Sequence, residues 1–277
     1  MTSILNATIM GFAVMLVAAA NGASNPTSQE KPAVGGHSLA AADSAAAVGG
    51  AISTSASVTA TSLYVSGGKD LNDGTAAIQW SFEASLPCAL YAGVWSALSI
   101  QERPTWEQYD EYDFYVGWVA VLHQGRRLVK CSIEHTYLLF PYFDGPNMDY
   151  HQSSVGFELP PSTTPGVSVT PYSKVHFAFA SNPQQADAIN TTTAILGLSG
   201  EFVPGRLETT VTPYVEVGYN SGGARGVRAG VSHLEGGVRT EWALGSVRFQ
   251  PGIHFQFSLE KTVDEENEVW TTLRLML

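Results

Sequence analysis

Ionisable side chains recur at every second position within segments that are otherwise apolar. Between Ser246 and Glu260, apolar residues occupy the odd positions, while Arg248, His254 and Gln256 lie on the even ones. A period of two places successive side chains on opposite faces of a β-strand. A polar row of this kind could line a pore and select solutes by charge and hydrogen bonding.

The polar faces of these alternating segments form the predicted lumen-lining set. It comprises the acids Glu83, Glu111, Asp113 and Glu134, the arginines Arg228, Arg239, Arg248 and Arg274, and the polar residues Gln79, His254 and Gln256. Most acids come from the first half of the chain and most arginines from the second. In a meander, sequence order maps to position around the wall, so we expect the two signs on opposing arcs. The resulting transverse field would favour small polar or zwitterionic solutes. The alternative is that these charges pair across the lumen and close it.

Catalytic and metal-binding signatures are few. The sequence contains no G-x-S-x-G, Walker loop, H-E-x-x-H or C-x-x-C pattern. The nearest catalytic constellation is His151 and Ser153 with Glu158, a single short spacing. The seven histidines show no metal-ligand spacing. We therefore expect no enzyme activity, no metal and no cofactor, and the net charge of −11 argues against a nucleic-acid partner.

The alternating segments must belong to long strands. The run from Ser246 to Glu260 exceeds the roughly 9 to 11 residues that a tilted transmembrane strand needs. Apart from the N-terminus, no segment has 18 consecutive apolar residues, which argues against a helical membrane protein and leaves a closed barrel. The sequence predicts an all-β fold, an antiparallel up-and-down transmembrane barrel of about 12 strands, with 10 to 14 possible. A secreted β-sandwich, with apolar faces packed on each other, is the soluble alternative.

The N-terminal part of the chain has a different composition. An apolar run from Ala7 to Ala20, followed by small residues, predicts a signal peptide over residues 1–23. Residues 24–59 are rich in Ala, Ser and Gly and poor in large apolar side chains, which predicts a flexible lead segment. The barrel is then expected over residues 60–277.

Aromatic residues and cysteines add two expectations. Aromatic side chains near strand ends suit interfacial girdles. They are Trp80, Trp95, Trp118, Trp242, Trp270, Tyr112, Tyr137, Tyr142 and Tyr219. Cys88 and Cys131 fall two strands apart in a meander, and that separation is roughly 9 to 10 Å. Because a disulfide needs a shorter Cα separation, we expect two free thiols.

Several motifs resemble those of a known family. LYAGVWS at 90–96, EYDFYVGW at 111–118, EHTYLLFPYFDG at 134–145 and the C-terminal NEVW look like elements of the TorF family of porin-like outer-membrane proteins. Gln79 stands where that family has a glutamine. The chain departs from the pattern at SGGKD, which lacks the R-G-x-S arginine, and at its last residue, Leu277 instead of Phe.

This resemblance implies a barrel in the outer membrane. We expect a passive channel for small polar solutes or ions, exported by the signal peptide. Its expected partners are outer-membrane lipid, the barrel-assembly machinery during insertion, and the solutes themselves. A non-conducting barrel with a structural or adhesive role remains the alternative function.

Overall fold

The computed structural model describes residues 52–72, 74–101, 110–124, 127–141, 148–164, 166–204, 209–224 and 226–277. Twelve long strands form one sheet. They are β1 (Ser53–Thr61), β4 (Ala77–Ser85), β5 (Leu90–Ser99), β6 (Glu111–Gln124), β7 (Arg127–Leu139), β8 (Tyr150–Glu158), β10 (Val167–Ala180), β11 (Thr191–Phe202), β12 (Thr210–Asn220), β13 (Gly230–Leu244), β14 (Val247–Ser258) and β15 (Glu268–Met276). The predicted signal peptide lies outside the described residues.

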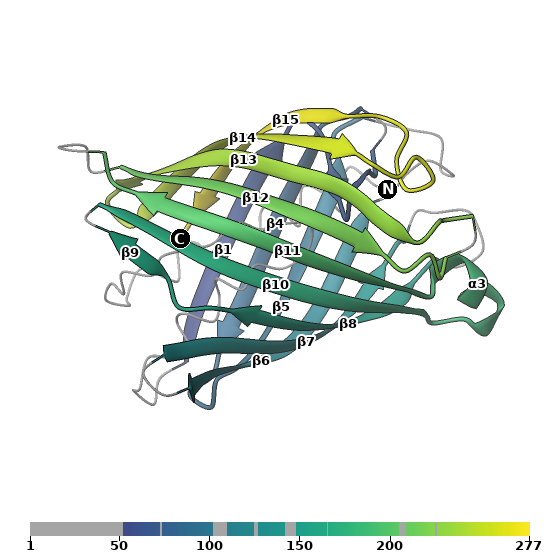
Figure 1. The fold of residues 1–277 in the computed structure, drawn as a ribbon, viewed down its shortest axis with the longest axis horizontal. Coiled ribbons are helices and arrows are strands. Elements are labelled where there is room, and N and C mark those ends of the chain that lie inside the picture. The colour runs from purple at the N-terminus through teal and green to yellow at the C-terminus, as the bar shows by residue number, and fades with distance from the viewer. Residues whose placement is uncertain are drawn as a thin grey trace, which may run out of the picture.

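Each long strand pairs antiparallel with the next one along the chain, and the last strand pairs with the first (Figure 1). The closing contact joins β1 to β15, with Ser57 opposite Met276 and Thr61 opposite Thr272. Closure leaves every long strand with two neighbours, which satisfies the backbone hydrogen bonds within the sheet. The predicted antiparallel barrel of about 12 strands is therefore confirmed.

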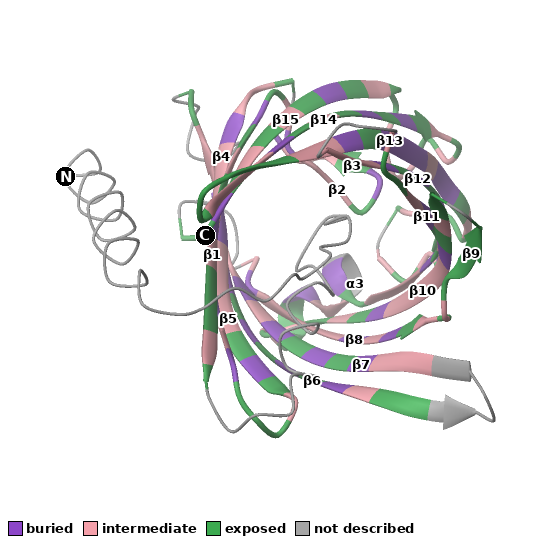
Figure 2. Ribbon diagram, turned by 90° about the vertical axis from the view of Figure 1, so that its left-hand side faces the viewer, coloured by how far each residue is buried: buried purple, intermediate pink, exposed green. Residues whose placement is uncertain are grey.

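The two faces of the wall have opposite chemistry. Along β12, Val215 and Val217 are exposed, whereas Tyr214 and Glu216 are buried. The same inversion holds around the ring, where many large apolar side chains are exposed and most buried side chains are polar. Figure 2 shows how buried and exposed positions alternate along the strands. An apolar outer wall around a polar interior is the pattern of a transmembrane barrel, and it is the opposite of the soluble sandwich.

The barrel begins earlier than its composition suggested. Ser53–Thr61 forms β1, which pairs with both β4 and β15, so the expected boundary at residue 60 was wrong. This strand has Val58 as its one large apolar residue. Its position between two strands supplies backbone hydrogen bonds on both sides, and these do not depend on large side chains. Residues 24–51 of the expected lead segment lie outside the described residues.

The two ends of the barrel differ in their connections. At the end where β1 starts and β15 ends, neighbouring strands are joined by short turns such as residues 86–89 and 245–246. The opposite end carries longer connections, including 62–76, 181–190 and 259–267. The segment 181–190 contains the short helix α3 (Ala186–Ile189). None of the helices in the described part of the chain is long and apolar enough to cross a membrane.

Pro251 interrupts the ladder between β13 and β14 without changing the register. Arg239 pairs with Gly252 and Trp242 with Phe249, while the two positions between them are unpaired. Proline lacks the N–H that a ladder bond needs. The local break expected at this residue is therefore confirmed, as are the two free thiols at Cys88 and Cys131.

Candidate functional site in the lumen

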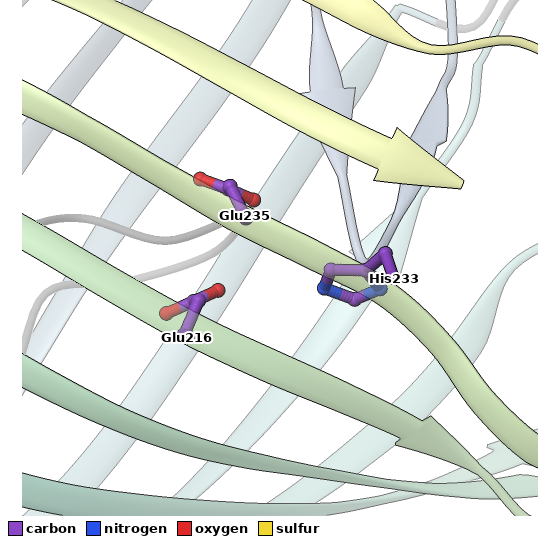
Figure 3. Close-up of side chains that lie close together, drawn as sticks. All are labelled: Glu216, His233 and Glu235. Carbon is purple, nitrogen blue, oxygen red and sulfur yellow. The ribbon is translucent and has the colours of Figure 1, made fainter. Parts of the chain in front are cut away.

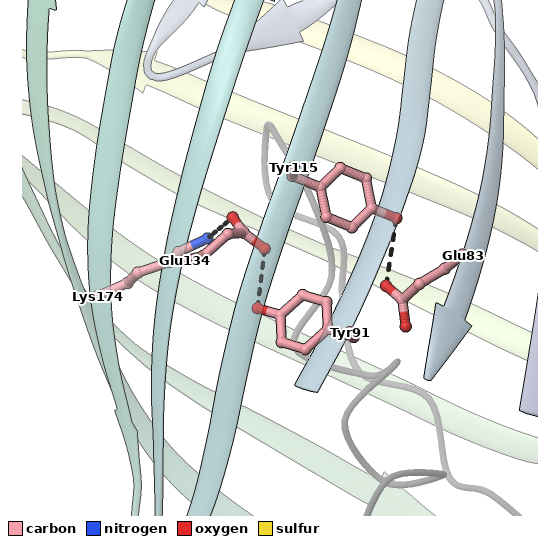
Figure 4. A network of polar contacts seen from close by, with 5 residues as sticks. All are labelled: Glu83, Tyr91, Tyr115, Glu134 and Lys174. Carbon is pink, nitrogen blue, oxygen red and sulfur yellow. Dashed lines mark hydrogen bonds and ion pairs between the residues drawn. The ribbon is translucent and has the colours of Figure 1, made fainter. Parts of the chain in front are cut away.

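Inward-facing tyrosines connect three consecutive strands at a time. Tyr115 of β6 lies opposite Gly93 of β5, and Gly93 lies opposite Glu83 of β4. The ring crosses the glycine, and its hydroxyl donates a hydrogen bond to Glu83 at 3.2 Å (Figure 4). A Cβ at position 93 would overlap this ring. We call this arrangement a Tyr–Gly–Glu bridge.

The same bridge occurs in the reverse direction from β5. Tyr91 crosses Gly117 of β6 and donates to Glu134 of β7 at 3.0 Å. The other oxygen of Glu134 lies 3.8 Å from Nζ of Lys174 on β10 (Figure 4). This ion pair connects the first bridges to the next part of the wall.

Two more tyrosines repeat this geometry on the far side of the ring. Tyr172 of β10 crosses Gly197 of β11 and donates to Glu216 of β12 at 2.8 Å. Tyr214 of β12 lies opposite Gly237 of β13. Its hydroxyl is within hydrogen-bond distance of a carboxylate and an imidazole, Glu235 Oε1 at 2.7 Å and His254 Nδ1 at 2.8 Å. Glycines crossed by aromatic rings are a recognised device for pinning strand register.

The predicted acids all lie in the strands and all point inward. Glu83, Glu111, Asp113 and Glu134 are each at most 6% exposed. Glu111 accepts a hydrogen bond from Tyr64, which follows β1. Among the predicted polar residues, His254 and Gln256 are buried and Gln79 is partly exposed. His254 Nε2 also lies 3.0 Å from Thr272 Oγ1 of β15.

The predicted arginines occupy three different environments. Arg239 is buried, and its guanidinium lies over the Tyr214 ring, 5.2 Å from the centroid. Arg274 donates to Ser57 at 3.2 Å, across the closing seam. Arg248 pairs with Glu241 at 3.5 Å near the short-turn end. Arg228 is not in a strand: it is exposed in the connection before β13, where its backbone N–H donates to Thr262.

The predicted acids lie on β4, β6 and β7 and the predicted strand arginines on β13, β14 and β15, but the part of the wall that holds the arginines also contains buried acids. Glu216 of β12 and Glu235 of β13 are directly opposite each other, and both are buried in the same arc as Arg239. Glu235 and His233 were missed in the sequence because a register shift between Gly218 and Tyr219 disturbs the alternation along β13. One extra residue in a strand moves the polar positions to the other parity.

A small hairpin lies inside the barrel near the end with long connections. It consists of β2 (Val65–Ser66) and β3 (Lys69–Asp70), within the connection from β1 to β4 (Figure 2). Gln256 Nε2 donates to the carbonyl of Gly68 at 3.0 Å, and a Cβ at Gly68 would overlap the His233 ring. The last residue of β3 is also held: the backbone N–H of Asp70 donates a hydrogen bond to the Asp264 carboxylate at 3.1 Å. The hairpin therefore narrows the lumen.

The outermost loops carry fixed polar contacts of their own. Glu260 Oε1 accepts from the N–H and the hydroxyl of Thr262, at 3.1 and 2.9 Å. These two donors hold the pKa of Glu260 below its ordinary value. Asp110, before β6, accepts from the Ser99 N–H at 2.8 Å, but burial raises its pKa overall.

Two of the aromatic residues expected in the girdles face inward instead. Trp95 packs against Tyr64, with centroids 5.8 Å apart, and Trp270 stacks on His254 at 5.3 Å. Trp118 and Trp242 are exposed on the outer wall, 42% and 56% respectively. Tyr142 lies outside the described residues.

The predicted constellation is divided between the two faces of β8: His151 and Ser153 lie on the outer wall, whereas Glu158 is on the lumen face with Ser154. His135 Nδ1 is 3.1 Å from Ser153 Oγ, and its Nε2 is 3.3 Å from His151 Nδ1. Glu158 lies at the far end of β8. The backbone around these side chains is paired in the β7–β8 and β8–β10 ladders, so its N–H groups are not free to stabilise an oxyanion.

The comparison with protein families gives a match over most of the chain. Residues 44–245 match the family described as "Bacterial protein of unknown function (Gcw_chp)". The chain belongs to this family. The matched range begins before β1 and ends after β13, so it covers most of the barrel. The comparison with curated proteins found no match.

The similar solved structures include an outer membrane channel. An outer membrane channel from Pseudomonas putida F1 is similar with a TM-score of 0.51 and 9% identity, over 92% of this chain and 99% of that one. LpxR from Salmonella typhimurium has a TM-score of 0.47 at 11% identity, over 80% and 99%. The NanC porin has a TM-score of 0.49 at 8% identity, over 80% and 98%. At such identities the likeness to the Pseudomonas channel shows the fold alone.

Proposed function

We propose that this protein is an outer-membrane channel for the passive diffusion of small polar solutes. The observation that carries the proposal is the mostly polar lining, which includes Glu134, Lys174, Glu216 and Arg239, inside an apolar wall. A lining of mixed charge offers hydrogen bonds to solutes and lowers the cost of removing their water. The motifs at 90–96 and 111–118, similar to those of the TorF porins, and the shared fold of the Pseudomonas channel support this function.

We propose that the end with long connections faces the cell exterior. Outer-membrane barrels have short periplasmic turns and longer extracellular loops. The short turns of this chain lie at the end that holds both the start of β1 and the end of β15. Insertion in this orientation requires the barrel-assembly machinery and surrounding outer-membrane lipid as partners. The β2–β3 hairpin then narrows the outer mouth of the channel.

The proposed solute class follows from the charged side chains of the lumen lining. Nε and Nη2 of Arg239 are buried and have no hydrogen-bond partner among the described residues. They can receive a carboxylate, while the nearby acids can receive an ammonium group. We therefore propose that small zwitterions such as amino acids pass more readily than uncharged sugars of similar size.

A liposome-swelling assay tests the proposed function. Reconstituted protein should let glycine enter faster than a neutral molecule of similar size, and should exclude a tetrasaccharide, because the hairpin and the bridges restrict the lumen. Heat-unfolded protein serves as the control for leakage. Liposomes that swell in none of the solutes would contradict a channel.

A non-conducting barrel is the second candidate function. It is favoured by the burial of the lumen side chains, since Glu216 is 1% exposed and Gln256 is 0% exposed. Charges that satisfy one another inside a barrel can close it. In that case the outer loops would carry the function, and swelling would be absent from folded protein.

A further inference from the structure

Three buried side chains of β12 and β13 place metal-ligand atoms close together. Glu216, His233 and Glu235 each offer one such atom, and these atoms all lie within 4.8 Å of one another. The imidazole is turned toward the two carboxylates, in the lumen face of the wall (Figure 3). All three side chains are at most 6% exposed.

Two atoms within this cluster have no hydrogen-bond partner among the described residues. They are Oε1 of Glu216 and Nε2 of His233. A buried polar atom without a partner costs about 1 to 3 kcal/mol, so such atoms point to a missing ligand. The opposing carboxylates add to this cost, since like charges directly across two strands repel.

The other atoms of the same side chains are held by neighbours. Tyr172 donates to Oε2 of Glu216, and Tyr214 donates to Oε1 of Glu235. Nδ1 of His233 lies 3.0 Å from the hydroxyl of Ser232. When Ser232 accepts from Nδ1–H, the lone pair of Nε2 is left for a metal. Outer contacts of this kind orient metal ligands and set the imidazole tautomer.

The local backbone explains how His233 reaches the cluster. A bulge at Ser232 shifts the register, so that His233, not Ser232, lies opposite Gly218. Bulges often re-aim a side chain next to a functional site. The His233 ring packs directly against two glycines, Gly218 of β12 and Gly68 of the hairpin. A Cβ at either glycine would overlap the ring.

We propose that Glu216, His233 and Glu235 bind one divalent transition-metal ion, with Zn²⁺ as the representative. One imidazole and two carboxylates form a donor set that Zn²⁺ accepts, and a fourth position remains for water. The ion would neutralise the opposed carboxylates and fix the ring that contacts the hairpin. This site does not depend on the proposed channel function.

The test is Zn²⁺ binding by the full chain, refolded in detergent and carrying no histidine tag. After equilibrium dialysis, the wild-type protein should retain one Zn²⁺ per chain by elemental analysis. His233→Gln should weaken binding by more than about 100-fold, because it removes a direct ligand, and Tyr172→Phe by about 10-fold, because it releases a carboxylate. His176→Gln is the matched control, since it removes another buried lumen histidine, on β10, that is outside this cluster.

Metal-free wild-type protein after dialysis would overturn the proposal, as would undiminished binding by His233→Gln. A proton shared between the two carboxyls would give the first of these outcomes. If His233→Gln does not fold, X-ray absorption of the wild-type complex decides. A shell with one imidazole among oxygen ligands supports the site, whereas oxygen ligands alone would show that zinc binds elsewhere.

Discussion

At the scale of the residue, the interior is organised by tyrosines that cross glycines. The Tyr91 ring of β5 lies over Gly117 of β6, and the Tyr115 ring of β6 lies over Gly93 of β5. The sequence contains a signal of this arrangement, since Tyr91 and Gly93, like Tyr115 and Gly117, are two positions apart on the same face. The carboxylate partners could not be predicted, because they depend on the register of a third strand.

Gly117→Ala tests these bridges. The added Cβ would overlap the Tyr91 ring, so the ring must move and lose its hydrogen bond to Glu134. We expect a loss of about 1 to 3 kcal/mol in the free energy of unfolding, as for other overpacked interiors. Urea unfolding of the refolded barrel measures it.

Gly200→Ala is the control for that substitution. Its new Cβ would have the Pro213 side chain as nearest neighbour, at 3.2 Å, with no tyrosine ring over it. Equal urea unfolding midpoints for Gly117→Ala and Gly200→Ala would show that the Tyr91 ring over Gly117 contributes nothing to stability.

At the scale of the element, strands with strong alternation were predictable and weakly patterned ones were not. The runs at β6, β12 and β14 alternate between apolar and polar residues, and the structure exposes the apolar face of each. β1 was missed because its Ser, Thr and Ala residues resemble a linker. β13 was misjudged because its bulge breaks the period on which the prediction depends.

Ile253→Arg tests whether the outer face of β14 meets lipid. Ile253 is 56% exposed near the middle of the strand, so an arginine there should cost about 2 to 4 kcal/mol in a bilayer. Leu244→Arg, at the end of β13, should cost only about 0 to 1 kcal/mol, because it lies near the interface. The free energies of folding of the two variants and the wild type are measured by refolding into lipid vesicles at a series of urea concentrations. Equal costs at the two depths would argue against a membrane around this wall.

At the scale of the whole molecule, the barrel follows from a few physical constraints. Long two-faced strands without a spanning helix leave closure as the way to satisfy the backbone in lipid, so the architecture was predictable from the sequence. The hairpin inside the barrel was not predictable from the sequence, because the segment SGGKD resembles an ordinary turn. Its position depends on Gln256 and Asp264, which lie far along the chain.

The central claim is that a polar lumen, narrowed by this hairpin, conducts. Planar-bilayer recording of the wild-type protein and of a variant with residues 65–70 replaced by Gly-Ser tests it most directly. We predict discrete small conductance steps for the wild type and larger steps for the variant, because the variant lacks the hairpin that narrows the mouth of the channel. Both proteins must first show the heat-modifiable gel mobility of folded barrels. Folded samples that give no steps in either form would contradict the account.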